Sequence, residues 1–313
     1  MIRYQAAAIA FKLFSLNGVT RAAYRKLGNY LRNRQAAALP ANYLQDKGYT
    51  EKAAWLITRL RQFRLLDKPS LRALEVGTGW MHYYGLTLAL AADAKIDLYD
   101  VWDNRQFHRL RAAFRTLDPA SLGLQPAEEE RARQRLADVE QAQDFDSLYK
   151  ALNKALNLNY HLDPGGRIDR LPENEFDLLF SMDVLEHIHN SFIANSISSM
   201  YRVLKPGGLS LHQLGVDDHL AHYDRHASPK QYLQYDDTTW RLRFQNEVQY
   251  FNRVSLDDIL RMFRKAGFEL VDKATSQYPA PLETLKIAPR FADQSAESLN
   301  ATRLYLVHRK PFN

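Results

Sequence analysis

The sequence contains no cysteine, and this absence excludes several kinds of protein at once. A 313-residue chain without thiols has no disulfide, no thiolate metal site, no Fe–S cluster and no cysteine nucleophile. The lack of cysteine fits a reducing compartment, and we expect a cytoplasmic protein. No stretch approaches the ~18 apolar residues that a membrane-spanning helix requires, so no membrane span is expected.

Acidic side chains are absent from residues 1–45, which carry seven Lys or Arg residues. This segment holds a charge of +7, and because the whole chain has a net charge of +6, the remainder sums to −1. We therefore expect no general nucleic-acid binding by the part of the chain after residue 45, which we call the body. Residues 1–35 are expected to form a basic amphipathic helix. This helix either packs on the body with a solvated basic face, or contacts an anionic membrane surface or a protein partner.

Strand and helix patterns alternate along the rest of the chain, which predicts an α/β, doubly wound, mostly parallel sheet. Strands are expected at 71–76, 95–101, 159–163, 176–181, 209–214, 268–274 and 302–309. Helices are expected at 51–66, 80–92, 190–204 and 256–266, the last capped by Ser255. Residues 205–208, Lys-Pro-Gly-Gly, are expected to form a turn.

The chain is expected to have a basic N-terminal helical extension, residues 1–50, and one domain, residues 51–313. Within that domain, residues 104–158 are expected to form an insertion of two or three helices, punctuated by Pro126 and by Asp144–Asp146. This insertion would serve as a substrate cap or as a homodimer surface. Residues 215–253 follow the fifth strand and are expected to form a substrate lid.

A glycine turn follows the first strand, in the stretch ALEVGTGWMH at 73–82. A dinucleotide fold would need Gly-x-Gly-x-x-Gly, and His82 stands where the third glycine belongs. What remains is Glu75, Gly77 and Gly79. A Gly-x-Gly turn alone is weak evidence, because glycine turns end many strands.

Further features indicate that this turn binds a ligand. Asp100 closes the second strand, so Asp100 and Glu75 are expected at the carboxyl ends of adjacent strands, where open α/β sheets bind ligands. A carboxylate at that position can accept hydrogen bonds from both hydroxyls of a ribose. The stretches FDLLFSMDVLEHI (176–188) and MYRVLKPGGLSLHQ (200–213) complete the pattern.

Together these motifs, over residues 71–214, resemble the class I S-adenosylmethionine-dependent methyltransferases. The GTGW turn is similar to that of a bacterial subgroup of uncertain substrate. The resemblance implies a seven-stranded sheet with an antiparallel C-terminal strand and S-adenosylmethionine as cofactor. It also implies that the glycine turn passes under the methionine part, that Asp100 holds the ribose, and that the residues after the fourth strand border cofactor and substrate. The cofactor-binding residues so implied are Glu75, Gly77, Thr78, Gly79, Trp80, Asp100, Ile168, Asp169, Ser181 and Met182.

The sequence departs from the family pattern in two places. Trp80 and Met81 stand where the family continues its glycine turn, and their bulk would reshape the methionine side of the pocket. Arg167 stands where the family often places an acid that holds the adenine amine. We therefore assign the adenine contact to Ile168 and Asp169.

Acidic and histidine side chains that follow the fourth and fifth strands are the candidates for chemistry. Asp183, Glu186 and His187 would share one face of a helix, which suits a divalent metal. The alternatives are that His187 is a base or substrate contact, or that its role is structural. His219, His222, Asp224 and His226 suggest metal ligation or proton transfer, or else a polar loop. Seven aromatic residues in 216–253 suggest either a mobile lid or a small satellite core.

We predict a methyltransferase that acts on an oxygen, or a nitrogen, of a small or medium-sized metabolite or glycan intermediate. In the expected scheme His187 or His219 accepts the substrate proton, and Glu186 orients or charges that histidine. One alternative is a metal-dependent RNA 2′-O-methyltransferase, which Glu186 and His187 would favour. Another is a non-catalytic cofactor-binding scaffold that its basic helix recruits.

Overall fold

The computed structural model describes residues 1–35, 48–278 and 285–312 of the chain. These residues fall into two compact units. We call residues 29–182, 202–211 and 312–313 the β1–β4 unit, and residues 1–28, 183–201 and 212–311 the β6–β7 unit. The strand order is β3-β2-β1-β4-β5-β7-β6, a seven-stranded α/β sheet as expected.

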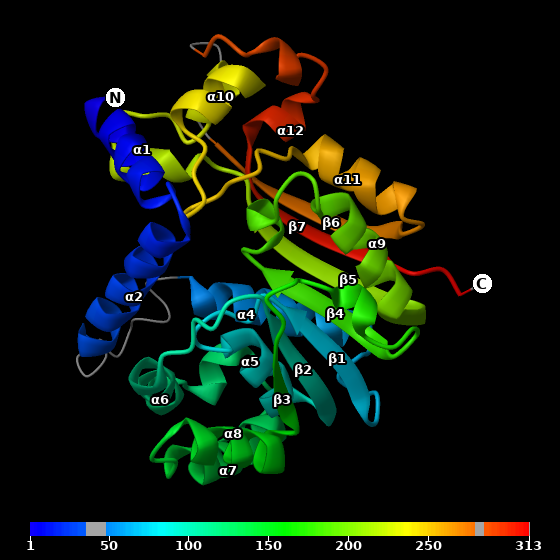
Figure 1. The fold of residues 1–313 in the computed structure, drawn as a ribbon. Helices are drawn as coiled ribbons and strands as arrows, with labels where there is room; N and C mark the ends of the chain where they lie inside the picture. Colours follow the sequence, from blue (N-terminus) through cyan, green and yellow to red (C-terminus); the bar gives the residue numbers. More distant parts are fainter. Residues whose placement is uncertain (36–47, 279–284, 313) are drawn as a thin grey trace. The chain divides into compact units, whose positions relative to one another are not determined.

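The β1–β4 unit contains four parallel strands (Figure 1). They are β1 (Leu71–Val76), β2 (Ala94–Asp100), β3 (Leu158–Leu162) and β4 (Phe176–Met182). All seven residues of β4 are buried, as expected of a strand that is covered on both faces. The register pairs Glu75 with Leu98 on β2 and with Phe180 on β4. The carboxyl ends of β1, β2 and β4 therefore lie at one edge of the sheet.

Helices of the β1–β4 unit include three from the predicted insertion. The helices are α4 (Tyr49–Gln62), α5 (Tyr83–Ala91), α6 (Phe107–Thr116), α7 (Pro126–Glu140) and α8 (Phe145–Leu156). Pro126 is the first residue of α7, where its missing N–H costs nothing. Asp144 caps α8 by accepting a hydrogen bond from the Ser147 N–H. The predicted punctuation of the insertion is thus confirmed.

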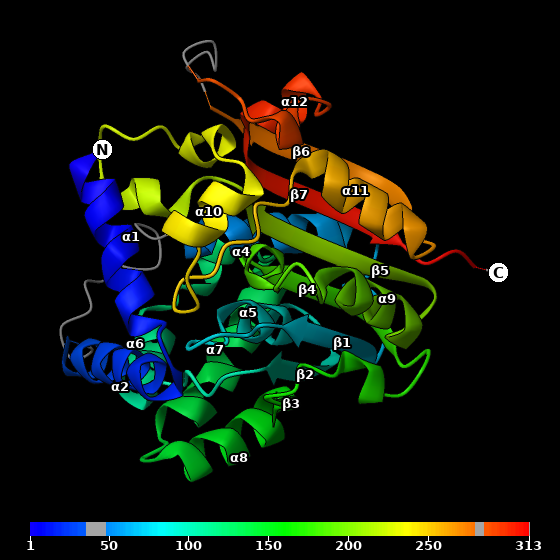
Figure 2. The same cartoon turned by 45° about the horizontal axis from the view of Figure 1, so that its top comes forward.

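The β6–β7 unit contains the antiparallel pair β6 (Glu269–Gln277) and β7 (Ala301–Arg309), which run side by side in Figure 2. Its helices are α1 (Ile2–Phe14), α10 (Asp237–Arg243), α11 (Leu256–Lys265) and α12 (Ala296–Asn300). Two further helices, α2 (Gly18–Gln35) and α9 (Ile193–Val203), belong to it only in part. Ser255 caps α11 as predicted, accepting a hydrogen bond from the Asp258 N–H.

Three local predictions need correction. Residues 1–35 form two helices, because the chain turns at Ser15–Asn17. Residues 205–208 belong to β5 (Leu204–Gly215), where Gly207 takes a positive φ of 78° and bends the strand without ending it. The stretch 185–187 is a 3₁₀ turn. Asp183 before it has a positive φ of 54°, so no α-helix passes through this region.

Most of the aromatic residues of 216–253 lie in a satellite core within the β6–β7 unit. Tyr232, Trp240, Phe244 and Phe251 are buried in it, together with residues of α1. The satellite core, rather than an exposed aromatic lid, accounts for the aromatic excess. No helix among the described residues is both long and apolar enough to cross a membrane.

Candidate functional site

The glycine turn, Gly77–Gly79, follows the carboxyl end of β1 and is hydrogen-bonded to the end of β2. Gly77 and Gly79 have positive φ values of 73° and 65°, which side chains disfavour. The Gly77 N–H donates to the Tyr99 carbonyl at 2.8 Å, so the turn is tied to the neighbouring strand. A Cβ on Gly79 would meet no atom within 4 Å. Gly79 therefore presents backbone without a side chain to open space.

Asp100 fixes this turn from the end of β2. Its carboxylate is 5% exposed and accepts hydrogen bonds from the Gly79 N–H at 2.9 Å and the Trp102 N–H at 3.0 Å. Burial raises the pKa of Asp100 above its usual range, while these backbone N–H groups lower it. Each carboxylate oxygen has a second lone pair, so Asp100 retains capacity for two hydroxyl donors.

Glu75 lies beneath the turn as a fully buried carboxyl group. It accepts hydrogen bonds from the Thr78 hydroxyl and the Gly85 N–H, both at 3.0 Å. Burial raises its pKa to about 8, against the lowering effect of these two donors. A Cβ on Gly85 would lie 2.5 Å from this carboxyl. Gly85 therefore permits the close approach of helix to strand that the third glycine provides in dinucleotide folds.

We predict that Glu75→Gln changes the pH dependence of stability. The folded pKa, about 8, is above the unfolded value of 4.5, so the stability linked to this proton is complete below pH 4.5 and is lost as pH rises through 8. A neutral amide does not suffer this loss, and its oxygen can still accept from both donors. The variant should be more stable than the wild type by roughly 3 kcal/mol at pH 9 and similar to it at pH 5. Urea unfolding at both pH values, with the exposed Glu51→Gln as control, measures the difference. Equal pH slopes in the variant and the wild type would contradict this reading.

His82 occupies the position that excludes a dinucleotide turn, and it does so in the left-handed backbone region with φ 52°. Its ring is buried between two hydroxyls: Nδ1 lies 2.9 Å from the Thr78 Oγ1, and Nε2 is hydrogen-bonded to the Tyr149 hydroxyl. Burial lowers the pKa of His82 to about 3, so the imidazole is neutral. A hydrogen-bond chain thus runs from Tyr149 on α8 through His82 and Thr78 to Glu75. No sequence pattern pointed to Tyr149 as a partner of His82.

The two bulky residues after the turn have different environments. Met81 is buried at 2% exposure. Trp80 is half-buried, with the Arg109 guanidinium 4.2 Å from its ring centroid and Tyr49 edge-on at 6.4 Å. Gly79 nevertheless faces open space, since a Cβ built on it would meet no atom within 4 Å.

The remaining predicted cofactor residues lie in the same unit. Ile168 is buried in a 3₁₀ turn, Ile168–Arg170, and the Asp169 side chain is exposed beside it. Ser181 and Met182 are buried at the end of β4. The β1–β4 unit thus contains all ten predicted cofactor residues.

The predicted catalytic residues lie in the β6–β7 unit. Glu186 is 2% exposed, and its Oε1 accepts a hydrogen bond from the Gly215 N–H at 2.8 Å. Its backbone carbonyl accepts from the Asn252 N–H, and the Asn252 side chain donates to the Leu185 and Ile188 carbonyls. Glu186 and Asn252 together hold the 3₁₀ turn that carries His187.

His187 has a defined tautomer. Its Nδ1 lies 2.7 Å from the Tyr250 carbonyl oxygen, which can only accept, so Nδ1 carries the proton. Nε2 is then the lone-pair nitrogen of an exposed ring. His219 stacks on this ring with centroids 5.0 Å apart. Burial, assisted by the neighbouring His187, lowers the pKa of His219 to about 4.

The four polar residues predicted as one cluster separate into two groups. His222 bonds Asp217 at 2.6 Å, and this hydrogen bond raises the pKa of His222. Asp224 instead accepts hydrogen bonds from the backbone N–H groups of Tyr4 and His226. Among the described residues, no group of three or more His, Asp or Glu side chains is placed to hold a metal ion. A helix would have brought Asp183, Glu186 and His187 together on one face. The 3₁₀ turn at this position does not form that metal site.

Gln213 near the end of β5 is a residue that the sequence reasoning missed. It is fully buried, and neither atom of its amide has a hydrogen-bond partner among the described residues. Such a group is costly unless a ligand completes it. A polar residue inside an apolar predicted strand was the available signal.

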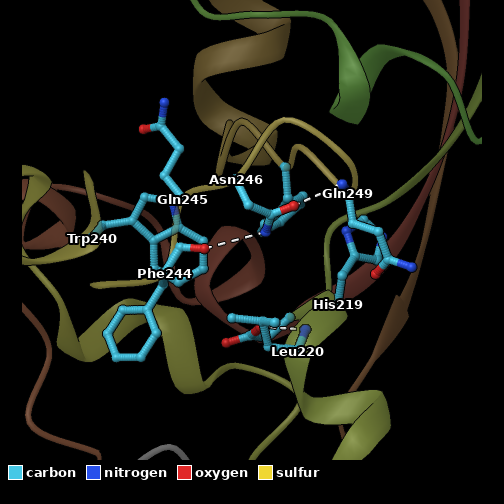
Figure 3. A pocket seen from close by; sticks show the side chains of 9 residues that line it. His219, Leu220, Trp240, Phe244, Gln245, Asn246 and Gln249 are labelled. Carbon is cyan, nitrogen blue, oxygen red and sulfur yellow. Dashed lines mark hydrogen bonds between the residues drawn. The ribbon is translucent and has the colours of Figure 1, made fainter. Parts of the chain in front are cut away.

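A small cavity lies beside His219, lined by Trp240, Phe244, Asn246 and Gln249 among others (Figure 3). The buried Nδ1 of His219 has no hydrogen-bond partner within the described part of the chain. The cavity volume is about 10 Å³, which is close to the space of one water molecule. This cavity is therefore too small to be the pocket for a methyl acceptor.

Comparison with known proteins defines the class. Residues 48–273 match the methyltransferase-domain family, and the chain belongs to this family. The protein is an S-adenosylmethionine-dependent methyltransferase, as the sequence predicted. No curated protein matches the sequence significantly.

Solved structures of low sequence identity are similar in fold. A Galdieria sulphuraria protein, assigned as a sarcosine dimethylglycine methyltransferase, has 13% identity and a TM-score of 0.48, with 84% of this chain and 85% of that chain covered. A chain from a Haloferax volcanii complex between the Trm112 methyltransferase activator and a methyltransferase has 12% identity and a TM-score of 0.44. The match covers 89% of this chain and 97% of that chain. A Mesorhizobium loti S-adenosylmethionine-dependent methyltransferase has 14% identity and a TM-score of 0.41, covering 77% and 91%. At these values no substrate or partner transfers to this chain.

Proposed function

We propose that this methyltransferase acts on a hydroxyl oxygen of a small or medium-sized metabolite or glycan intermediate, with His187 as the general base. The observation that carries this proposal is the tautomer of His187. The Tyr250 carbonyl holds the proton on Nδ1, which leaves the exposed Nε2 lone pair to accept a proton. A hydroxyl nucleophile needs such a base, whereas a neutral amine needs only positioning.

The cofactor residues fit S-adenosylmethionine by two features: the bare backbone at Gly79, and the spare acceptor capacity of buried Asp100. We propose that Gly77, Thr78, Gly79 and Trp80 hold the methionine part above Glu75, and that Asp100 holds the ribose. Ile168 and Asp169 would hold the adenine, and Ser181 and Met182 would border the reacting groups. When bound, the cofactor supplies an electrophilic methyl group that is open to in-line displacement.

The side chains around His187 support its role as base. Loss of the hydroxyl proton to Nε2 makes His187 an imidazolium, and the proton then leaves to solvent because the ring is exposed. His219, stacked on this ring, stays neutral near pH 7 because its pKa is about 4. Glu186 positions His187, because its carboxylate accepts a hydrogen bond from the Gly215 N–H and so fixes the 3₁₀ turn that carries His187. Gln213 would contact the acceptor.

We expect His187→Gln to lower methyl transfer by about 100-fold or more, because the amide cannot accept the proton. The assay follows tritium from labelled S-adenosylmethionine into the small-molecule fraction of a cell extract. Affinity for S-adenosylhomocysteine should stay unchanged, since His187 lies outside the proposed cofactor residues. His226→Gln, an exposed histidine of the same unit, is the control. Full transfer by His187→Gln would exclude the base role and favour a nitrogen acceptor.

A further inference from the structure

The N-terminal helix α1 has two apolar faces. Tyr4, Ala8 and Phe11 are buried on one face and belong to the satellite core. Ile2, Ile9 and Leu13 recur at a helical spacing on a second face, about half a turn away from the first. Their side chains are 86%, 61% and 58% exposed. A helix that only packed on the body would need the first face alone.

The second face continues past the end of α1. Leu16 in the connecting turn is 72% exposed, and Val19 at the start of α2 is 78% exposed. Leu27, two turns beyond Val19 on the same side of α2, is also exposed. Exposed large apolar residues are thus concentrated in one short segment, which marks an interaction surface.

Charge identifies the partner. No acidic residue occurs in residues 1–45, and Arg3 and Lys26 are exposed within the same segment as the apolar residues. Around the α1 axis, Arg3 and Lys12 lie about a quarter turn to either side of the Ile2, Ile9 and Leu13 face. Arg3 is exposed, whereas the Lys12 ammonium donates hydrogen bonds to the Arg241 and Gln245 carbonyls. An apolar face flanked by cations is the arrangement of helices that lie in the headgroup region of an anionic bilayer.

A second copy of the chain fits this surface poorly. A two-fold interface places the same patch of both copies together, and here it would bring two segments of like charge into contact. We propose that α1 and the start of α2 dock the enzyme on an anionic membrane surface through Ile2, Ile9, Leu13 and Leu16. This inference does not rest on the proposed reaction.

Sedimentation of the full-length protein with lipid vesicles tests the proposal. Vesicles of phosphatidylcholine alone are compared with vesicles that also contain phosphatidylglycerol, with no cofactor or substrate present. The protein should bind the anionic vesicles and lose that binding at high salt. Ile9→Gln with Leu13→Gln should weaken binding at least about tenfold. Arg3→Gln with Lys26→Gln should weaken it roughly tenfold as well.

Leu270→Gln is the matched control, because Leu270 is 47% exposed on β6, an element outside α1 and α2. Thermal unfolding should be the same for all variants, since only exposed side chains change. Absence of binding to both vesicle types would overturn the proposal. Binding that survives the Ile9 and Leu13 substitutions would also overturn it. Dimerisation lost with those substitutions, without vesicle binding, would assign the face to a second copy instead.

Discussion

Replacing Asp100 with Ala is expected to weaken S-adenosylhomocysteine binding at least about 100-fold. The buried carboxylate is proposed to accept hydrogen bonds from the ribose hydroxyls, and each such bond to a charged acceptor contributes about 1.5–3 kcal/mol. Asp100 also accepts from the Gly79 N–H, so its loss frees the glycine turn. Isothermal titration calorimetry of both proteins measures the difference.

Two further variants separate the binding role from a folding role. Asp100→Asn keeps an acceptor for the turn but lacks the charge, so it should fold normally and bind with intermediate affinity. Asp103→Ala removes a more exposed carboxylate three residues further on, which is paired with Arg105, and should bind like the wild type. Affinity of Asp100→Ala within about threefold of the wild type would remove Asp100 from the site.

Replacing Lys230 with Met is expected to destabilise the protein by about 3 kcal/mol. Lys230 is fully buried in the β6–β7 unit, and its Nζ donates to the Val216 carbonyl, the Ala301 carbonyl and the Tyr232 hydroxyl. Burial lowers its pKa to about 7, while Asp217 and Asp218 raise it. Met fills a similar volume but donates no hydrogen bond, so the Ala301 carbonyl loses the Lys230 donor, while the Val216 carbonyl keeps only the Tyr232 hydroxyl.

Urea unfolding measures this loss, and Lys95→Met, an exposed lysine, is the control with little expected effect. The prediction concerns stability alone, so S-adenosylhomocysteine affinity should be retained in the folded variant. A change below about 0.5 kcal/mol would mean that the desolvation cost of the ammonium equals what its three hydrogen bonds contribute.

The sheet was predictable because its signals are local. Apolar runs such as Phe176–Ser181 and caps such as Ser255 act on neighbouring residues, and the structure has them where they were expected. The Lys-Pro-Gly-Gly stretch was misread because β5 begins at Leu204, before the proline. The two helices within residues 1–35 were merged although Asn17-Gly18 is a turn signal, and Asn17 accepts hydrogen bonds from the Val19 and Thr20 N–H groups at the start of α2.

The site was less predictable because its contacts are distant in sequence. Glu186 was expected to act on a histidine, yet its carboxylate bonds the Gly215 N–H, 29 residues away. The tautomer of His187 depends on the Tyr250 carbonyl, 63 residues away. His82 was correctly read as excluding a dinucleotide turn, but its hydrogen bond joins it to Tyr149 in the helical insertion, 67 residues away. None of these partners follows from spacing or composition.

The central proposal is that the glycine turn holds the cofactor, and a crystal structure with S-adenosylhomocysteine tests this directly. We expect the ribose hydroxyls to bind the Asp100 carboxylate and the homocysteine part to lie over Gly77–Gly79. A ligand bound elsewhere, or a turn closed by Trp80 with no ligand present at saturating concentration, would contradict it.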